Sequence, residues 1–261
     1  MLISRETISI SGRRLTIDND TRDSPEVSVM LPDPSETDGE IVAVGGELSP
    51  EILLSAYRRG IFPWFTDGEP ILWWSLNPRF ILHPKQIRLS KKLRRHIRRS
   101  AYRFTLDAAF PLVIGHCREV KRPAQKGTWI TNDMVKAYTK LNELGYAHSV
   151  ETWKGEELAG GLYGVALGGC FYGESMFTLQ PEASKLAFAA LVGALIDADF
   201  GLIDCQQHTQ LLSSFGAVDI PRKRFLGMLA LELKKPTFKG NWKKFFPEFP
   251  KSALWNSFEV N

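Results

Sequence analysis

Two acidic residues lie in otherwise apolar segments, which makes them the first candidates for chemistry. Glu174 lies in the middle of the segment 171–177, and Asp204 precedes Gln206 in the segment 201–207. A carboxylate at the end of a buried strand costs several kcal/mol unless it is paired. Such a group can take up a proton or attract a cation, but a structural salt bridge or a helix cap would explain each of them as well.

Tryptophans beside proline and glycine turns are the second candidates, because an aromatic ring can stack on a nucleic-acid base. Trp64, Trp73, Trp74 and Trp129 all lie in or near such turns. Most tryptophans are core residues, and one of the adjacent Trp73 and Trp74 is expected to be buried. Trp64 follows Pro63 in a turn and could present its ring to a base, a contact worth about 1–3 kcal/mol.

A basic segment runs from Lys85 to Arg103 and contains nine Lys or Arg residues and no acid. The net charge of the chain is +4, and removing these nine from the 33 bases leaves 24 against 29 acids. A helix is expected over residues 90–99, in which Leu93 and Ile97 are the only apolar residues. Like charges at helical spacing repel, so an anionic partner should compensate them. A phosphate backbone and an anionic membrane both fit, and the thin apolar stripe favours nucleic acid.

Cysteine and histidine patterns argue against a metal site or a disulfide framework. Cys117, Cys170 and Cys205 are widely spaced, and the five histidines lack the spacing of metal ligands. We find no Walker loop, G-x-G-x-x-G fingerprint or acetyl-CoA pyrophosphate turn, so no cofactor is expected. The longest apolar run, residues 186–196, is too short to cross a bilayer. The N-terminus has no apolar signal core, and the expected location is a reducing cytoplasm.

Helices and strands both contribute to the expected fold, whose class is α+β. A small N-terminal α+β domain with an aromatic segment is expected over residues 1–77, and a larger domain over 78–261, with Pro78 at the boundary. The first 30 residues should form a hairpin or a loose arm, and the tail from Lys234 should be loosely ordered at best. Hydrophobic periodicity predicts helices at 49–60, 90–99, 132–144, 186–198, 208–215 and 221–234, and strands at 80–83, 148–153, 158–165, 170–172 and 201–205.

Six short strings occur in the same order as in a known family. They begin at Gly45, Arg59, Trp73, Gly127, Gly173 and Leu202 and read GGELSP, RGIFPWF, WWS, GTWIT, GESMF and LIDCQ. Together they resemble the leucyl/phenylalanyl-tRNA–protein transferase family, over the part of the chain from about Leu31 to Leu229. The first 30 residues and the tail past Lys234 lie outside this likeness.

The resemblance implies both a fold and a reaction. The larger domain would have the N-acetyltransferase-like (GNAT) fold, with a charged tRNA in place of acetyl-CoA as the acyl donor. The implied enzyme is an aminoacyltransferase, a leucyltransferase that moves Leu or Phe, with Met as a further candidate, from aminoacyl-tRNA. The acceptor would be the α-amine of a protein that begins with Arg or Lys, and the product would be a bacterial N-degron. No cofactor and no membrane partner are implied, and a monomer is expected.

The resemblance also implies roles for individual residues. Trp64 would stack on the terminal adenine of the tRNA, and Trp129 would help to shape the aminoacyl site. Glu174, Asp204 and Gln206 would form the polar centre. A pocket for an apolar side chain unbranched at Cβ would be lined by Leu162, Phe171, Phe177, Leu191 and Ile203. The acceptor stem of the tRNA would be held by Arg88, Lys91, Lys92, Arg94, Arg95, Arg98 and Arg99.

The implied reaction starts from an ester that is already activated. The enzyme must hold a neutral amine about 3–3.5 Å from the carbonyl carbon, stabilise the oxyanion and accept a proton. One hypothesis is that Asp204, acting through Gln206, orients the amine and takes the proton. Glu174 would then attract the cationic N-terminus or its Arg or Lys side chain. The rival hypothesis moves the proton through the ribose hydroxyls of the tRNA.

Two other classes of function remain open. A CoA-dependent N-acyltransferase of the same fold would take label from acetyl-CoA, and a non-catalytic RNA-binding protein would bind tRNA and give no product. The missing pyrophosphate turn argues against the first, and the pairing of an apolar pocket with strand-end carboxylates argues against the second. Family members commonly carry a His-Leu pair where this chain has Leu211-Leu212, with His208 nearby. His208 therefore receives no role.

Overall fold

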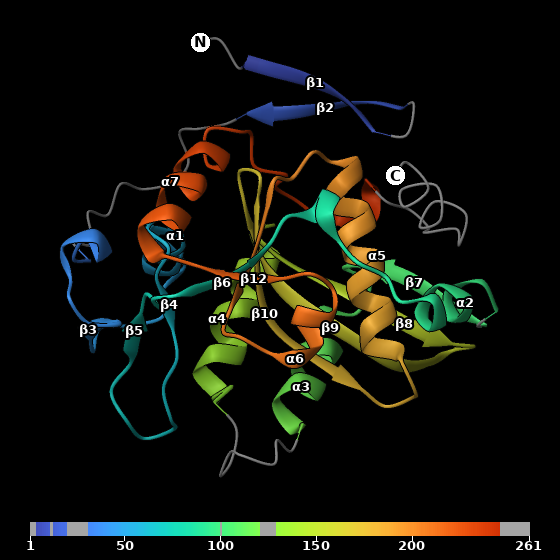
Figure 1. Ribbon diagram of the computed structural model, residues 1–261, viewed down its shortest axis with the longest axis horizontal. Coiled ribbons are helices and arrows are strands. Elements are labelled where there is room, and N and C mark those ends of the chain that lie inside the picture. The colour runs from blue at the N-terminus through green and yellow to red at the C-terminus, as the bar shows by residue number, and fades with distance from the viewer. Residues whose placement is uncertain (1–3, 11–12, 20–30, 100, 121–128, 246–261) are drawn as a thin grey trace.

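A seven-stranded sheet forms the centre of the protein (Figure 1). The structure, a computed structural model, describes residues 4–10, 13–19, 31–99, 101–120 and 129–245. The strand order is β12-β6-β11-β10-β9-β8-β7, and only β10 and β11 are parallel neighbours among the pairs of this sheet. The strands are β6 (Arg79–Leu82), β7 (Tyr102–Leu106), β8 (Ala147–Lys154), β9 (Glu157–Leu167), β10 (Cys170–Thr178), β11 (Leu202–Gln206) and β12 (Val218–Ile220).

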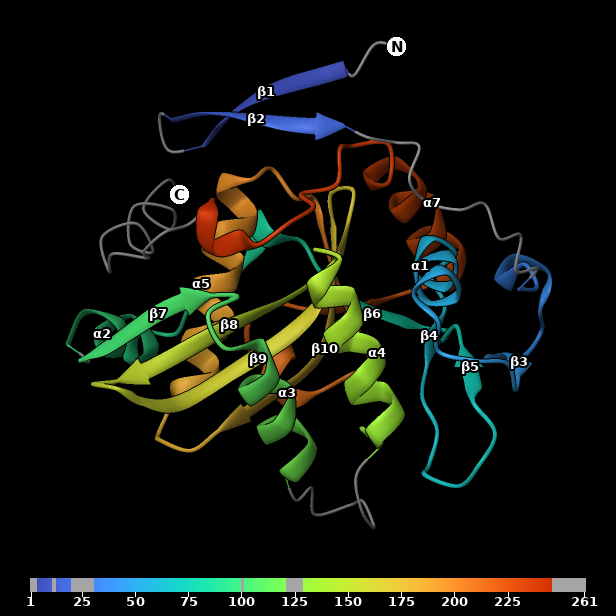
Figure 2. The same cartoon turned by 180° about the vertical axis from the view of Figure 1, so that it is seen from behind.

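Helices cover both faces of this sheet, as Figure 1 and the reverse view in Figure 2 show. One face carries α5 (Ala183–Asp197) and α2 (Lys91–Arg99), and the two apolar residues of α2 pack into the same cluster as α5. Because it is packed on the sheet over most of its surface, α5 buries 12 of its 15 residues. The other face carries α1 (Pro50–Arg58), α3 (Phe110–Glu119), α4 (Asn132–Glu143) and α7 (Arg222–Glu232), whose buried residues share a second cluster. The short α6 (Gln210–Ser214) follows β11.

A smaller three-stranded sheet lies beside α1 and supplies the aromatic segment. Its order is β3-β5-β4, with β3 (Ile41–Val44), β5 (Leu72–Trp74) and β4 (Phe62–Pro63). As expected for adjacent residues of a strand, Trp73 is buried and Trp74 is only partly buried. Gly60 ends α1 with a φ of +69°, and a Cβ there would meet Phe225 at 2.7 Å, so only glycine fits. Near the N-terminus, β1 (Ser4–Ile10) and β2 (Arg13–Asn19) pair as an antiparallel hairpin.

The α+β class and the predicted strands at 148–153, 158–165 and 170–172 are confirmed, and these strands, β8, β9 and β10, form an antiparallel meander. Sequence periodicity missed β7 and α3. The expectation of a loose tail is wrong for residues 234–245, because Trp242 is buried and lies in the short helix η3 (Trp242–Lys244). The remaining part of that tail, residues 246–261, lies outside the described residues.

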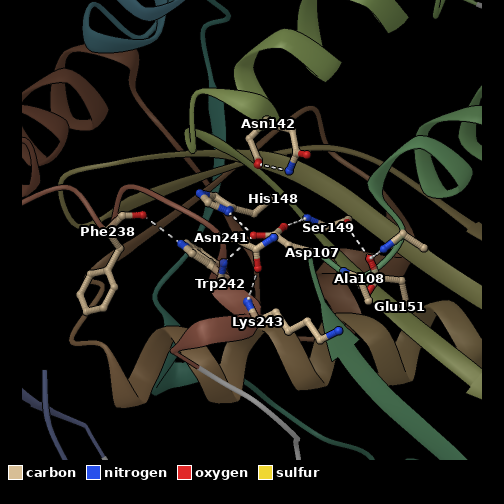
Figure 3. Close-up of polar contacts among 12 residues, drawn as sticks. Asp107, Ala108, Asn142, His148, Ser149, Glu151, Phe238, Asn241, Trp242 and Lys243 are labelled. Atoms are coloured by element: carbon tan, nitrogen blue, oxygen red, sulfur yellow. Dashed lines mark hydrogen bonds and ion pairs between the residues drawn. The ribbon is translucent and has the colours of Figure 1, made fainter. Parts of the chain in front are cut away.

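A buried polar cluster holds this C-terminal segment against the end of β7 (Figure 3). Asp107 accepts hydrogen bonds from the backbone N–H groups of Ser149 at 2.8 Å and Trp242 at 2.7 Å. His148 Nδ1 lies 2.9 Å from Asp107 Oδ2, and its ring stacks on Trp242 with centroids 3.9 Å apart. Three partners therefore satisfy a carboxylate that would otherwise be costly to bury.

Candidate active site

The candidate site forms where β10 and β11 separate. These parallel strands pair only between Cys170–Tyr172 and Leu202–Asp204. Just beyond that stretch, each strand shifts register against its outer neighbour, β10 between Gly173 and Ser175 and β11 between Asp204 and Gln206. Bulges of this kind bend a strand and re-aim a side chain. They turn Glu174 and Gln206 toward one another across the gap, where Gln206 Nε2 donates to Glu174 Oε1 at 2.9 Å.

An open cavity of about 750 Å³ occupies this gap. It is mainly apolar, and Glu174 and Gln206 supply polar groups in its wall. Of the residues expected at the substrate, the structure places Trp64, Trp129, Leu162, Phe171, Leu191 and Ile203 in the same wall. A volume of this order fits an amino-acid side chain together with a nucleoside-sized group.

Phe177 and Asp204 are absent from this wall, although the sequence analysis groups them with the site. Phe177 is buried on the other side of the sheet, where its ring stacks on His116 with centroids 4.9 Å apart. The structure therefore brings together six of the seven expected substrate-binding residues and two of the three expected polar residues.

Glu174 is the centre of a buried hydrogen-bond network. Tyr57 donates its hydroxyl to Oε1 at 2.7 Å, and Tyr138 donates to Oε2 at 3.0 Å. The oxygen atoms of the two tyrosine hydroxyls are also in contact with each other. Burial raises the pKa of Glu174 to about 7, and the hydrogen bonds from Tyr57, Tyr138 and Gln206 oppose this rise. At neutral pH the carboxyl is therefore poised between its two protonation states.

Both tyrosines of this network remain protonated. Burial and the neighbouring Glu174 carboxylate raise the pKa of Tyr57 and of Tyr138 well above the usual value. They lie in the helices predicted over residues 49–60 and 132–144, but the sequence analysis assigned them no role. The signal that could have found them is chemical, because a buried tyrosine hydroxyl needs a hydrogen-bond partner.

Asp204 is fully buried and belongs to a different network. Arg79 binds it in a bidentate manner, with Nε 2.7 Å from Oδ1 and Nη2 2.5 Å from Oδ2. The Arg79 guanidinium lies between the rings of Phe62 and Phe225, each 4.7 Å from its centroid. Asp204 Oδ1 also accepts the backbone N–H of Gln206 at 2.9 Å. The backbone of Gln206 has a φ of +60°, which is strained for a non-glycine residue. The hydrogen bond to Asp204 helps to hold the backbone in this conformation.

Trp64 reaches the cavity from the small sheet. Its carbonyl accepts the indole N–H of Trp74 at 2.7 Å, and the two rings lie 5.6 Å apart at 52°. Trp64 is half-buried, so part of its surface is open to a ligand. Trp129, which precedes α4 in the chain, also lines the cavity. Gly127 and Thr128 of the same string lie outside the described residues.

The basic helix α2 exposes its cations beside α5. All seven cations expected at tRNA are exposed: Arg88, Lys91, Lys92, Arg94, Arg95, Arg98 and Arg99. Phe188 and Leu191 of α5 line the cavity, and α5 packs in one cluster with Leu93 and Ile97 of α2. The positive helix and the cavity therefore share α5 as a common wall.

His208 occupies the loop that borders the cavity. Its Nδ1 lies 2.8 Å from Asp219 Oδ2, and its Nε2 lies 3.2 Å from Ser213 Oγ. Its neighbours Gln207 and Thr209 line the cavity. The histidine thus ties this loop to β12.

Within the described ranges, no group of three or more His, Cys, Asp or Glu residues is arranged to hold a metal ion. In the same ranges, no helix has the length and apolar character that a membrane span requires.

Two family models and several known proteins match this chain. A model of the leucyl/phenylalanyl-tRNA protein transferase matches residues 81–230, and a model of the N-terminal domain of the same transferase matches residues 46–77. The chain is 54% identical over 217 residues to a leucyl/phenylalanyl-tRNA–protein transferase of Anaeromyxobacter sp. (strain Fw109-5), covering 83% of this chain and 92% of the relative. Relatives of the same name in Syntrophus aciditrophicus and Myxococcus xanthus are 51% and 50% identical, each covering 84% of this chain and 89% and 94% of the relative. The chain belongs to the leucyl/phenylalanyl-tRNA–protein transferase family.

Proposed function

We propose that this aminoacyltransferase moves Leu or Phe from a charged tRNA to the N-terminal amine of a protein that begins with Arg or Lys. Family membership supports the transfer from tRNA to protein. The observation that carries the proposal is the juxtaposition of Glu174 and Gln206 with an apolar cavity beside a basic helix. The amino-acid side chain would fill the apolar wall, and the acceptor amine would approach the polar groups.

The reaction needs one group to accept a proton. The amine nitrogen attacks the ester carbonyl carbon, a C–N bond forms, and the C–O3′ bond to the ribose breaks. The amine releases one proton, and the O3′ leaving group takes one up. A base with a pKa near the working pH can perform both transfers, and Glu174 has a pKa of about 7.

Glu174 is favoured over Asp204 as this proton acceptor. Glu174 lies in the cavity wall, whereas both carboxylate oxygens of Asp204 are bound by Arg79. Asp204 instead acts as a positioning residue, because it fixes the backbone of Gln206. Gln206 in turn orients the Glu174 carboxylate through its side-chain amide.

The remaining roles follow the positions of the side chains. Trp64 would stack on the terminal adenine, and α2 would hold the acceptor stem through its exposed cations. The divergence of the parallel strands β10 and β11 supports the expected GNAT-like fold of the larger domain. We also propose that the acting form is a monomer. Charged tRNA is a cytoplasmic molecule, and we place the reaction in the cytoplasm.

The direct test incubates the protein with tRNA charged with radiolabelled leucine and a peptide that begins with Arg. Label should appear at the peptide N-terminus as Leu-Arg, and an N-acetylated copy of the peptide should stay unlabelled. Transfer from labelled acetyl-CoA but not from charged tRNA would favour the N-acyltransferase class. Binding of tRNA without product for any acceptor would favour the non-catalytic RNA-binding class.

A further inference from the structure

A second group of lysines follows the segment that the family model matches. The match ends at residue 230, and residues 233–245 contain five lysines and no acid. Lys235 is paired with Asp199 and Glu232. The C-terminal lysine surface, defined as Lys239, Lys243 and Lys244, is exposed. Within the described ranges no acidic partner is found for these three side chains.

The fold holds this surface in a fixed position. Trp242, immediately before Lys243, is buried and donates its backbone N–H to Asp107 at 2.7 Å and its indole N–H to the Phe238 carbonyl at 2.9 Å (Figure 3). Gly240 donates its N–H to the Gly145 carbonyl at 3.0 Å. The lysines are therefore presented by an anchored segment.

The C-terminal lysine surface and α2 lie at opposite ends of α5, on the same face of the sheet. Lys92 of α2 lies 3.7 Å from Glu182 at the start of α5. Trp242 packs against Phe200, just past the end of α5, with ring centroids 6.0 Å apart. Figure 2 shows the segment in red beside the upper end of α5, with α2 farther down on the side of β7. A helix of 15 residues spans about 22 Å, so the two basic groups are separated by roughly that length.

An extended polyanion suits two basic groups at this separation better than a compact ligand does. Double-helical nucleic acid carries phosphates continuously along its length, so one arm can contact both groups. An anionic membrane suits the surface less well, because insertion requires exposed apolar side chains. Phe238 and Trp242 of this segment are buried, and its other large apolar residues, Leu233 and Phe245, are partly buried against the core.

We propose that the C-terminal lysine surface binds the phosphate backbone of the same tRNA whose acceptor end is held by α2. This inference rests on the proposed function. It adds a contact distant from the reacting ester, so its contribution is to the affinity for whole tRNA and not to the chemical step.

The test compares two donors in the double variant Lys243→Ala/Lys244→Ala. One donor is whole charged tRNA, and the other is an aminoacyl ester of adenosine alone, which is too short to reach the surface. The expected result is a rise of about tenfold in the KM for charged tRNA with an unchanged kcat, and unchanged kinetics with the adenosine ester. The slope of log affinity for tRNA against log salt should become shallower by about 1.5 to 2. The matched control is Lys136→Ala/Lys140→Ala on α4, which removes the same charge from the opposite face.

The proposal would be overturned if kcat/KM fell equally with both donors, or if the KM for charged tRNA did not change. It would also be overturned if the control variant raised this KM as much as the test variant. Reduced binding to phosphatidylserine vesicles with unchanged use of tRNA would assign the surface to a membrane and also overturn it. Failure of the proposed function is distinguishable, because the wild-type protein would then give no product with either donor. In that case the slope of log affinity against log salt, compared between the wild type and the double variant with uncharged tRNA, would still measure the contact with the lysine surface.

Discussion

Gln206 donates its side-chain amide to the Glu174 carboxylate at 2.9 Å, although the two residues lie on neighbouring strands beyond the point where those strands pair. Glu174 lies within the register shift of β10, and Gln206 follows the register shift of β11. The two bulges therefore convert the end of a parallel strand pair into a cavity with polar groups in its wall. The same distortion explains why the site is deep enough to bury a carboxylate and raise its pKa.

The first prediction concerns the pH profile of Glu174→Gln. The acceptor amine must be neutral, and a free α-amine has a pKa of about 7.7–8.0. Glu174 must be ionised to take the proton, and burial raises its pKa to about 7. Below about pH 6.5, log kcat/KM for the acceptor peptide should therefore rise with a slope near 2 in the wild type and near 1 in the variant. The rate of the variant should be lower by about 10²–10⁴.

Glu151→Gln is the matched control for this profile. Glu151 is also a buried glutamate whose pKa is raised by burial, but it accepts hydrogen bonds from Thr105 and Ser149 and is not part of the cavity wall. The Glu151→Gln control should keep the wild-type slope near 2 below about pH 6.5, because both the amine and Glu174 still titrate. A Glu174→Gln enzyme with an unchanged slope would instead support proton transfer through the ribose hydroxyls.

The second prediction links the same residue to stability. The pKa of Glu174 is raised from 4.5 to about 7 on folding, so between these values the folded state keeps a proton that the unfolded state has released. Its contribution to the free energy of unfolding therefore falls as pH rises through this window. Glu174→Gln should gain stability relative to the wild type by about 2–3 kcal/mol between pH 5 and pH 8. Urea denaturation at the two pH values measures the gain, and a difference that does not change with pH would contradict it.

The third prediction separates charge from position at Asp204. Asp204→Asn leaves the buried Arg79 guanidinium without its counter-charge, and such a loss costs about 3–5 kcal/mol. Activity should fall more than tenfold in single turnover, but the pH limb assigned to Glu174 should persist. If the slope of log kcat/KM below about pH 6.5 fell to near 1 in Asp204→Asn and stayed near 2 in Glu174→Gln, Asp204 would be the proton acceptor.

A double variant provides the control for stability at this position. Replacing Arg79 with Met and Asp204 with Leu removes both buried charges between the rings of Phe62 and Phe225. Most of the lost stability should return, because apolar residues often replace a buried ion pair without cost. Activity should stay low, since the backbone N–H of Gln206 loses its acceptor. A stable double variant with full activity would show that Asp204 does not position Gln206.

Local patterns predicted much of the fold but little of the polar network. The apolar positions of α4 and the apolar runs of β8 to β10 could be predicted, because each pattern lies within one element. Tyr57 and Tyr138 are 81 residues apart, and no local pattern indicates that their hydroxyls meet at Glu174. Strand bulges are likewise set by the neighbouring strands, so the contact between Glu174 and Gln206 was not readable from spacing.

In the C-terminal segment, local sequence predicted a loop where the structure is ordered. Lysine, proline and glycine dominate residues 234–244, and this composition is typical of a loop. Trp242 nevertheless fills a site built by His148 and Asp107, both of which are distant in sequence. Buried Trp242 and Phe238, together with the bond from Gly240 to Gly145, thus order a segment whose average composition predicts a loop.

The fourth prediction tests this anchor. Trp242→Ala should lower the free energy of unfolding by about 3–5 kcal/mol, because a buried aromatic ring is replaced by a cavity. Limited proteolysis should then cut the segment after residue 233 faster than in the wild type. Trp153→Ala serves as a control, since its ring is only partly buried and should cost less. Unchanged protection of the segment would contradict an anchoring role.

The fifth prediction concerns the size of the amino-acid pocket. Leu191 lies on α5 and lines the cavity together with Leu162 and Phe171. Leu191→Phe adds volume to this wall, so the larger phenylalanyl group should lose more transition-state binding than the leucyl group. A change of about 1–2 kcal/mol corresponds to a 5- to 30-fold shift in the ratio of kcat/KM for Leu-tRNA over Phe-tRNA.

The ratio is measured with both charged tRNAs in competition for one acceptor peptide, so differences in protein concentration and in tRNA-body contacts cancel. Leu231→Phe makes the same chemical change at a residue that is 62% exposed on α7, and it should leave the ratio unchanged. An equal loss with Leu and Phe would mean that Leu191 shapes the site without contacting the amino-acid side chain. A shift in favour of Phe would place the aminoacyl group in another part of the cavity.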